Sequence, residues 1–201
     1  MNFYTKNPVL SKAKSPRLNI NIHSRYSSAA SENMYHFDFN YGLKKIAFFS
    51  SISKSDYGNL LMGSNGPSEY LRPNYVIQNS AGEDIIVDNS NPKLQRNTSY
   101  DQLNFLQKVL YKPNKNFQYD LGIHLSKTGD IPRYDRLIRQ DQNLDFVYAD
   151  WFYGPQEWLL INNQISINWK SNNVFDKLKI TFAKQKFSES RNSRKFNTSN
   201  L

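Results

Sequence analysis

Two stretches of the chain alternate between apolar and polar residues almost without interruption. In residues 35–41, Tyr, Phe, Phe and Tyr alternate with His, Asp and Asn, and residues 117–126 repeat the pattern with Phe, Tyr, Leu, Ile and Leu. A period of two is typical of strands with two unlike faces. Here the apolar face is aromatic or aliphatic throughout, and the other face carries carboxylates, amides and imidazoles. This combination favours a sheet between lipid and a watery lumen, although aromatic-rich strands also occur in soluble β proteins.

Composition is compatible with a membrane sheet and excludes a helical membrane span. No apolar run approaches the roughly 18–20 residues that a membrane helix needs, and the mean hydropathy is −0.72. Barrel strands keep the average low because only alternate residues face lipid. The 13 Tyr, 13 Phe and 3 Trp would suit the aromatic girdles of such a barrel.

Charge and cysteine content narrow the function classes. With no Cys, disulfides and thiol chemistry are excluded and the compartment stays open. The formal charge of +9 is scattered, without an aromatic–basic RNA-binding motif, so we expect no nucleic-acid partner. The first residues lack the apolar core of a signal peptide.

The pattern predicts an all-β fold, an antiparallel meander of about seven or eight strands, and favours an outer-membrane β-barrel. The expected strands cover residues 17–26, 35–41, 45–53, 100–111, 117–125, 156–169 and 175–187. We expect outward-facing side chains at Phe37, Phe39, Tyr119, Leu121, Ile123, Ile165 and Ile167. Inward-facing side chains are expected at His36, Asp38, Asp120, His124, Asn162 and Gln164.

The connections from the second strand onward alternate between tight and long. Tight turns are expected near Gly42, Pro113 and Asn172, and long loops at 55–97 and 126–154. Compact soluble domains rarely hold unstructured loops beyond about 12–15 residues. Outer-membrane barrels commonly have short periplasmic turns and long extracellular loops, so both long loops are expected to be extracellular.

Residues 130–137, which read DIPRYDRL, stand out within the second long loop. Pro132 keeps Ile131 extended, and Arg133, Asp135 and Arg136 can form charge-assisted hydrogen bonds. The motif could contact ligand or gate the loop, or it could brace the loop against Trp151, Tyr153 and Gln156; we favour bracing. Ligand contact is expected instead from residues 65–72 and 78–88.

A search for catalytic motifs predicts no enzyme, no cofactor and no metal site. Nucleophile elbows, phosphate loops and zinc-protease motifs are missing from the sequence. His23, His36 and His124 lie on polar strand faces without a reason to converge on zinc. Asp38 and Asp120 could form an acid pair, but lumen-lining polarity is the favoured interpretation.

Several longer segments resemble the barrel domain of TonB-dependent outer-membrane receptors of Bacteroidota. They are residues 130–137, 148–156 (YADWFYGPQ), 188–191 (SESR) with 194–196 (RKF), 25–29, 55–60 with 62–63, 75–76 and 89–95. Residues 1–8 are similar to the last strand of the family's plug domain. The resemblance runs through most of the chain in the family's order.

This resemblance implies that the meander is an incomplete segment of a large outer-membrane β-barrel. The parent would be a receptor for energy-coupled uptake of a scarce nutrient, such as a metal-siderophore, a corrinoid or an oligosaccharide. We expect residues 1–16 to end the plug domain and lead into the barrel, 17–187 to form a partial transmembrane barrel, and 188–201 to begin a truncated extracellular loop. The full-length parent would lie in the outer membrane. Its partners would be lipid and lipopolysaccharide, the inner-membrane TonB protein through the missing plug, and a small nutrient ligand. A soluble carbohydrate-binding β-sandwich is the alternative.

Structural or gating roles in the loops are expected for residues within the segments that resemble the receptor family. These are Pro132, Arg133, Tyr134, Asp135, Trp151, Tyr153, Gly154, Pro155, Gln156, Glu189 and Arg191.

Overall fold

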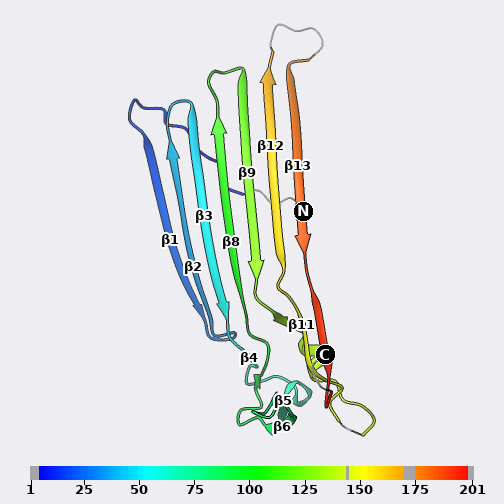
Figure 1. Ribbon diagram of the computed structural model, residues 1–201. Coiled ribbons are helices and arrows are strands. Elements are labelled where there is room, and N and C mark those ends of the chain that lie inside the picture. Colours follow the sequence, from blue (N-terminus) through cyan, green and yellow to red (C-terminus); the bar gives the residue numbers. More distant parts are fainter. Residues whose placement is uncertain (1–4, 144, 170–174, 199–201) are drawn as a thin grey trace.

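The protein is built around one antiparallel sheet of seven long strands (Figure 1). The computed structural model describes residues 5–143, 145–169 and 175–198. Strands are adjacent in chain order, and each has 11 or 12 residues. In sheet order they are β1 (Arg17–Ser27), β2 (Glu32–Gly42), β3 (Ile46–Tyr57), β8 (Tyr100–Tyr111), β9 (Phe117–Thr128), β12 (Glu157–Asn168) and β13 (Lys177–Ser188).

The prediction of an all-β antiparallel meander is confirmed. All seven expected strands form, and β2, β3 and β9 extend three or four residues beyond the expected bounds at the end that carries the long connections. The described strands make an open sheet. The expected turn near Asn172 lies outside the described residues.

The long connections carry secondary structure of their own, which the sequence interpretation missed. Between β3 and β8 lie β4 (Leu60–Leu61), a short 3-10 helix η1 (Ser68–Tyr70), the β5–β6 hairpin (Asn74–Gln78 and Asp84–Asp88) and β7 (Leu94–Gln95). Between β9 and β12 lie β10 (Ile131–Pro132), α1 (Tyr134–Leu137) and β11 (Tyr148–Tyr153). After β13, β14 (Arg191–Lys195) pairs with β11. The segments expected as plain loops are therefore folded.

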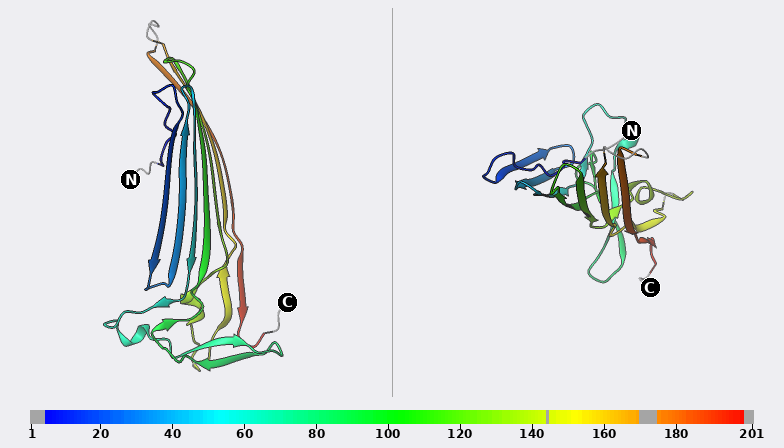
Figure 2. Two further views of the ribbon diagram at one scale, coloured as in Figure 1. Left: turned by 90° about the vertical axis from the view of Figure 1, so that its left-hand side faces the viewer. Right: turned by 90° about the horizontal axis from the view of Figure 1, so that it is seen from above.

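These short elements gather at one end of the sheet, and we call them the loop cap (residues 58–99, 129–156 and 189–198) (Figures 1 and 2). The cap has a small core of its own, in which Val76, Phe146 and Ala149 are buried and Phe196 packs against them. The three segments of the loop cap thus pack on one another and form a single folded unit.

The long sheet is a single layer (Figure 2). Its two faces carry different side chains. On the apolar face, hydrogen-bonded register aligns Ile22, Phe37, Ile52, Phe105, Leu125 and Leu159 in one line across six strands. Several large side chains on this face are solvent-exposed, from 37% for Phe37 to 79% for Ile22, whereas Leu159 and most apolar residues of β9 and β12 are half-buried. Residues 165 and 167 of β12 and 119, 121 and 123 of β9 share this face by alternation.

The polar face carries the intervening residues. The neighbouring register line reads Asn21, Asp38, Ser51, Leu106, His124 and Leu160. Asp38 and Asn40 are buried, unlike the rings beside them in the same strand. The predicted separation of rings from amides and carboxylates is therefore present, and on β2 the polar side chains are the more buried ones. Among the described residues, no helix is long and apolar enough to cross a membrane.

Candidate functional site

The buried carboxylate of Asp38 is the centre of a polar network on β2. It is 2% exposed, and its oxygens accept hydrogen bonds from Lys6 Nζ at 2.7 Å and Asn21 Nδ2 at 2.7 Å. His36 Nε2 lies 3.0 Å from the same carboxylate, and His36 Nδ1 lies 2.6 Å from the Ser53 hydroxyl. A buried charge needs such partners, because it has lost its hydration. The network therefore holds one rigid anionic point on the polar face.

Residues 5–11 cross the polar face as an extended segment, which we call the N-terminal strap. Besides the Lys6 ion pair, the amide nitrogen and carbonyl of Val9 both bond the side chain of Asn40, at 2.7 and 3.0 Å. Ser11 N donates to the carbonyl of Leu43 at 3.0 Å. A Cβ at Gly42 would collide with the Val9 carbonyl, so glycine at this position permits the close approach.

The strap covers apolar as well as polar positions, since Ala47 and Phe49 are buried on the polar face of β3. It forms no strand in the structure, so the strand expected over residues 1–8 is not found in residues 5–8, and residues 1–4 lie outside the described part of the chain. The expected plug-derived segment is nonetheless docked on the sheet by side-chain contacts.

Beside the strap the polar face is hollowed by a cavity of about 480 Å³. The strap contributes Thr5 and Asn7, and Lys108 Nζ donates to Asn7 Oδ1 at 2.9 Å across the opening. Four of the residues expected to face inward line it: Asp120, His124, Asn162 and Gln164. The arrangement can hold a polar segment or molecule between the strap and strands β8, β9 and β12.

The candidate catalytic and metal residues are spread across the sheet. His23 and His36 are register partners on β1 and β2, whereas His124 lies on β9. Asp38 and Asp120 are separated by strands β3 and β8. Within the described ranges, no group of three or more His, Cys, Asp or Glu could hold a metal ion.

The predicted loop residues do come together, as a stack of guanidinium groups and rings in the loop cap. The Arg133 guanidinium lies 5.0 Å from the centre of the Trp151 ring and 5.7 Å from the centre of the Tyr153 ring. The guanidinium of Arg191, on β14, lies 5.4 Å from the centre of the Tyr153 ring, on β11. Arg133 Nη1 also donates to the Tyr153 hydroxyl at 3.0 Å. These cation–π contacts tie β10, β11 and β14 together.

Backbone pairing supports the same stack. Pro132 pairs in register with Phe152, Tyr153 pairs with Arg191, and Arg133 N donates to the Trp151 carbonyl at 2.9 Å. Asp135 accepts from Arg133 at 2.9 and 3.1 Å on the exposed side.

The remaining predicted loop residues mark the junction between the cap and β12. Gly154 has a φ of 155° and its nitrogen donates to the Ser190 carbonyl at 3.0 Å. A Cβ there would meet Asp130, which explains the need for glycine before Pro155. Gln156 Nε2 donates to Glu189 Oε2 at 2.7 Å, and Arg191 pairs with the other Glu189 oxygen at 3.2 Å. The ring of Tyr134, another of the predicted loop residues, lies against the guanidinium of Arg72 and outside the Arg133 stack.

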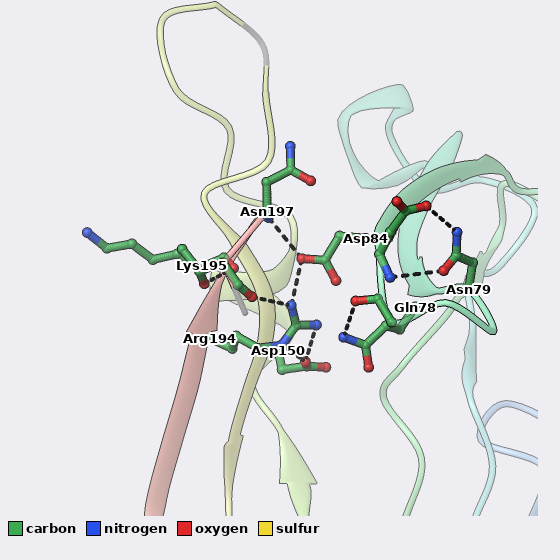
Figure 3. Close-up of polar contacts among 10 residues, drawn as sticks. Gln78, Asn79, Asp84, Asp150, Arg194, Lys195 and Asn197 are labelled. Atoms are coloured by element: carbon green, nitrogen blue, oxygen red, sulfur yellow. Dashed lines mark hydrogen bonds and ion pairs between the residues drawn. The ribbon is translucent and has the colours of Figure 1, made fainter. Parts of the chain in front are cut away.

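An ion cluster in the cap, which the sequence did not reveal, joins β6 to β14 (Figure 3). Arg194 Nη1 lies 2.6 Å from Asp84 Oδ2, and Arg194 Nη2 lies 2.7 Å from Asp150 Oδ2. Asn197 N donates to the same Asp84 oxygen at 2.9 Å. The hydrogen bond from Arg194 lowers the pKa of Asp84, and the two carboxylates raise the pKa of Arg194. Asp84 and Arg194 are 110 positions apart, so no local pattern could pair them.

Comparison of the chain with protein-family models, with curated proteins and with solved structures finds no significant match.

Proposed function

We propose that this chain is a segment of an outer-membrane β-barrel receptor of the TonB-dependent kind, which takes up a scarce nutrient and is not an enzyme. The observation that carries the proposal is an exposed apolar face on the long sheet, with buried polar side chains on the opposite face of β2. Side chains such as Ile22 and Phe37 are exposed, whereas Asp38 and Asn40 are buried. A contiguous apolar surface of this kind is a liability in water, and hydrocarbon is the solvent that it fits.

The apolar band ends earlier in β13 than in the other strands. The register line of Ile22 stays apolar as far as Leu159 of β12 and then reaches Lys186 of β13. The alternating apolar residues of β13 end at Phe182, and Lys184 and Lys186 follow on the same face. An apolar strand face that becomes cationic fits a strand that leaves the hydrocarbon layer.

The distribution of connections agrees with the proposal. The turns that follow β2 and β8 are short, whereas the connections of 42 residues (58–99) and 28 residues (129–156) both lie at the opposite end. Outer-membrane barrels show the same asymmetry, with the longer loops outside the cell. The loop cap would then be extracellular, and the turns near Gly42 and Pro113 periplasmic.

The polar face would line the lumen, and the strap would be the stretch that leads from the plug into the barrel. Its ion pair, amide bonds and close contact at Gly42 fit a permanent attachment between the lumen wall and a preceding domain. The resemblance of residues 130–137 and 148–156 to the receptor family adds support, and it suggests a scarce nutrient such as a metal-siderophore, a corrinoid or an oligosaccharide as the cargo.

A soluble β-sandwich would need a second sheet over the exposed rings. In the described part of the chain, the short strands collect at one end of the long sheet and leave its apolar face uncovered (Figure 2). The geometry therefore favours the membrane proposal over the carbohydrate-binding sandwich.

Fractionation of cells that express the complete gene tests the proposal. We expect the product in the outer-membrane fraction, extracted by detergent and not by carbonate or high salt. Recovery of folded product in the soluble fraction would contradict it. In a second test, we expect the isolated chain to adopt β structure in detergent micelles and to aggregate in plain buffer. A soluble sandwich would instead be folded without detergent and would melt cooperatively.

A further inference from the structure

The loop cap contains a buried cation without a counter-charge. Arg72 is 4% exposed, and no ion pair within the described residues includes it. Its guanidinium bonds the Arg96 carbonyl through Nη1 and lies 5.2 Å from the centre of the Tyr134 ring. Its Nε is buried and has no hydrogen-bond acceptor among the described residues.

This arrangement is costly as it stands. Loss of hydration at a buried charge is unfavourable unless the charge is paired with an opposite charge. The Arg96 carbonyl and the Tyr134 ring carry no net charge, so they do not neutralise the positive charge of Arg72. Burial accordingly lowers the pKa of Arg72. The neighbouring Arg96 lies 5.8 Å from the Tyr75 ring, and its buried Nε also has no acceptor in the described part of the chain. Positive charge is therefore concentrated here, and a carboxylate that would balance it is missing among the described contacts.

A cavity of about 280 Å³ opens beside this guanidinium. Arg72 and Tyr134 form part of its wall, Asn74 and Gln140 add amide groups, and the exposed Glu69 of η1 contributes the one carboxylate in the described lining. The volume suits a small molecule or one end of a larger one. Ring and amides can position a planar anionic group, while the guanidinium supplies the charge.

We propose that this cavity binds an oxyanion, the carboxylate or phosphate group of a small ligand, with Arg72 as its charge partner. The anion would accept from the terminal guanidinium nitrogens and from the amides of Asn74 or Gln140. Glu69 would weaken binding by repulsion and so limit the site to ligands that keep their charge on the Arg72 side. The inference concerns the cap alone and does not depend on what solvates the long sheet.

Titration calorimetry of the full chain tests the proposed oxyanion site, with folding verified by circular dichroism in micelles or in buffer. Sodium acetate and sodium phosphate are titrated separately, with sodium chloride at equal ionic strength as the reference. We expect one saturable site for an oxyanion and none for chloride. Tighter acetate binding would assign a carboxylate ligand, and tighter phosphate binding a phosphate ligand.

Two variants and a matched control locate the site. Arg72→Gln should weaken oxyanion binding at least tenfold, whereas Arg139→Gln, which removes an exposed charge elsewhere in the loop cap, should leave it within twofold. Glu69→Gln should tighten binding at least twofold at low salt, and it keeps the test decisive if Arg72→Gln does not fold. Absence of saturable oxyanion binding to the folded chain would overturn the proposal. So would equal effects of the two arginine variants, or an unchanged affinity in Glu69→Gln.

Discussion

Lys6 Nζ lies 2.7 Å from Asp38 Oδ2, so a lysine that is 62% exposed is paired with a carboxylate that is 2% exposed. The pair joins the strap to the centre of the polar face, 32 positions further along the chain. The carboxylate is also held by Asn21 and His36, so residues of the sheet fix its position together with Lys6. The sheet therefore supplies the acceptor, and the strap supplies the cation.

The first prediction is that Asp38→Asn releases the strap. The substitution keeps the shape and removes the charge, and loss of charge-assisted hydrogen bonds should cost about 1–3 kcal/mol. Hydrogen exchange of the Val9 and Ser11 amides should rise at least tenfold. Asp101→Asn, at the cap end of β8, is the control and should leave these amides protected. Unchanged protection in Asp38→Asn would show that the Asn40 and Leu43 contacts hold the strap alone.

The second prediction concerns the ion cluster at Arg194. Asp84 is 1% exposed and Asp150 is 53% exposed on the same guanidinium. Asp84→Asn should therefore lower the free energy of unfolding of the cap by about 2–3 kcal/mol. Asp150→Asn should lower it by about 0.5–1 kcal/mol, because the solvent already screens that pair. Native-state exchange of the β5–β6 and β14 amides measures both, and equal losses would contradict the assignment.

The same cluster predicts a pH dependence. The folded-state pKa of Asp84 is lowered by Arg194, so its stabilisation is fully present above the unfolded value of about 3.9. It is lost as the pH falls through the folded value. The stability difference between the wild type and Asp84→Asn should be constant from pH 7 to about pH 5 and shrink below about pH 4. A difference that grows on acidification would refute the stabilisation of the Asp84 carboxylate by Arg194.

The long strands could be predicted from sequence because most of them contain a stretch in which apolar and polar residues alternate, clearest in β2 and β9. The unexpected extensions of β2, β3 and β9 consist mostly of polar residues such as Lys54 and Ser55, which show no hydrophobic alternation. These residues form strand because residues of the neighbouring strands lie opposite them. Lys54 pairs with Tyr35 and Leu103, and Ser55 pairs with Met34 and Gln102. A strand end that forms by pairing with neighbouring strands depends on those strands, and it has no sequence pattern of its own.

The cap was less predictable, for two different reasons. The β5–β6 hairpin had a signal, since apolar residues at 75–77 and 85–87 flank a turn at Gly82, whose φ is 82°. That signal was hidden by the surrounding Asn, Ser and Pro. The Asp84–Arg194 pair had none, because a long-range contact between single charges has no sequence period. The grouping of Arg133 with Trp151 and Tyr153 came from the resemblance to the receptor family, and their mutual stacking came only from the structure.

The third prediction is that the Arg133 stack braces the cap. Arg133→Lys keeps the charge but loses the planar guanidinium that contacts Trp151 and Tyr153. Exchange at the amides of β10 and β11 should rise severalfold. Asp135→Asn is the matched control, since its carboxylate is exposed and its removal leaves the rings stacked; it should change exchange by less than twofold. A gating role without bracing would leave the amides of Arg133→Lys protected.

The fourth prediction tests which solvent bathes the apolar face. Ile123→Arg places a charge at the middle of β9 on that face, and near a bilayer midplane it should cost about 2–4 kcal/mol. Gln164→Arg, a matched charge on the polar face of the adjacent β12, faces water and the Asp120 carboxylate opposite it in register, so it should cost less than about 1 kcal/mol. Urea titration of the full-length parent in lipid vesicles measures both losses. If Gln164→Arg costs as much as Ile123→Arg, or more, then the rings of this sheet do not face hydrocarbon, and the membrane proposal loses the observation on which it depends.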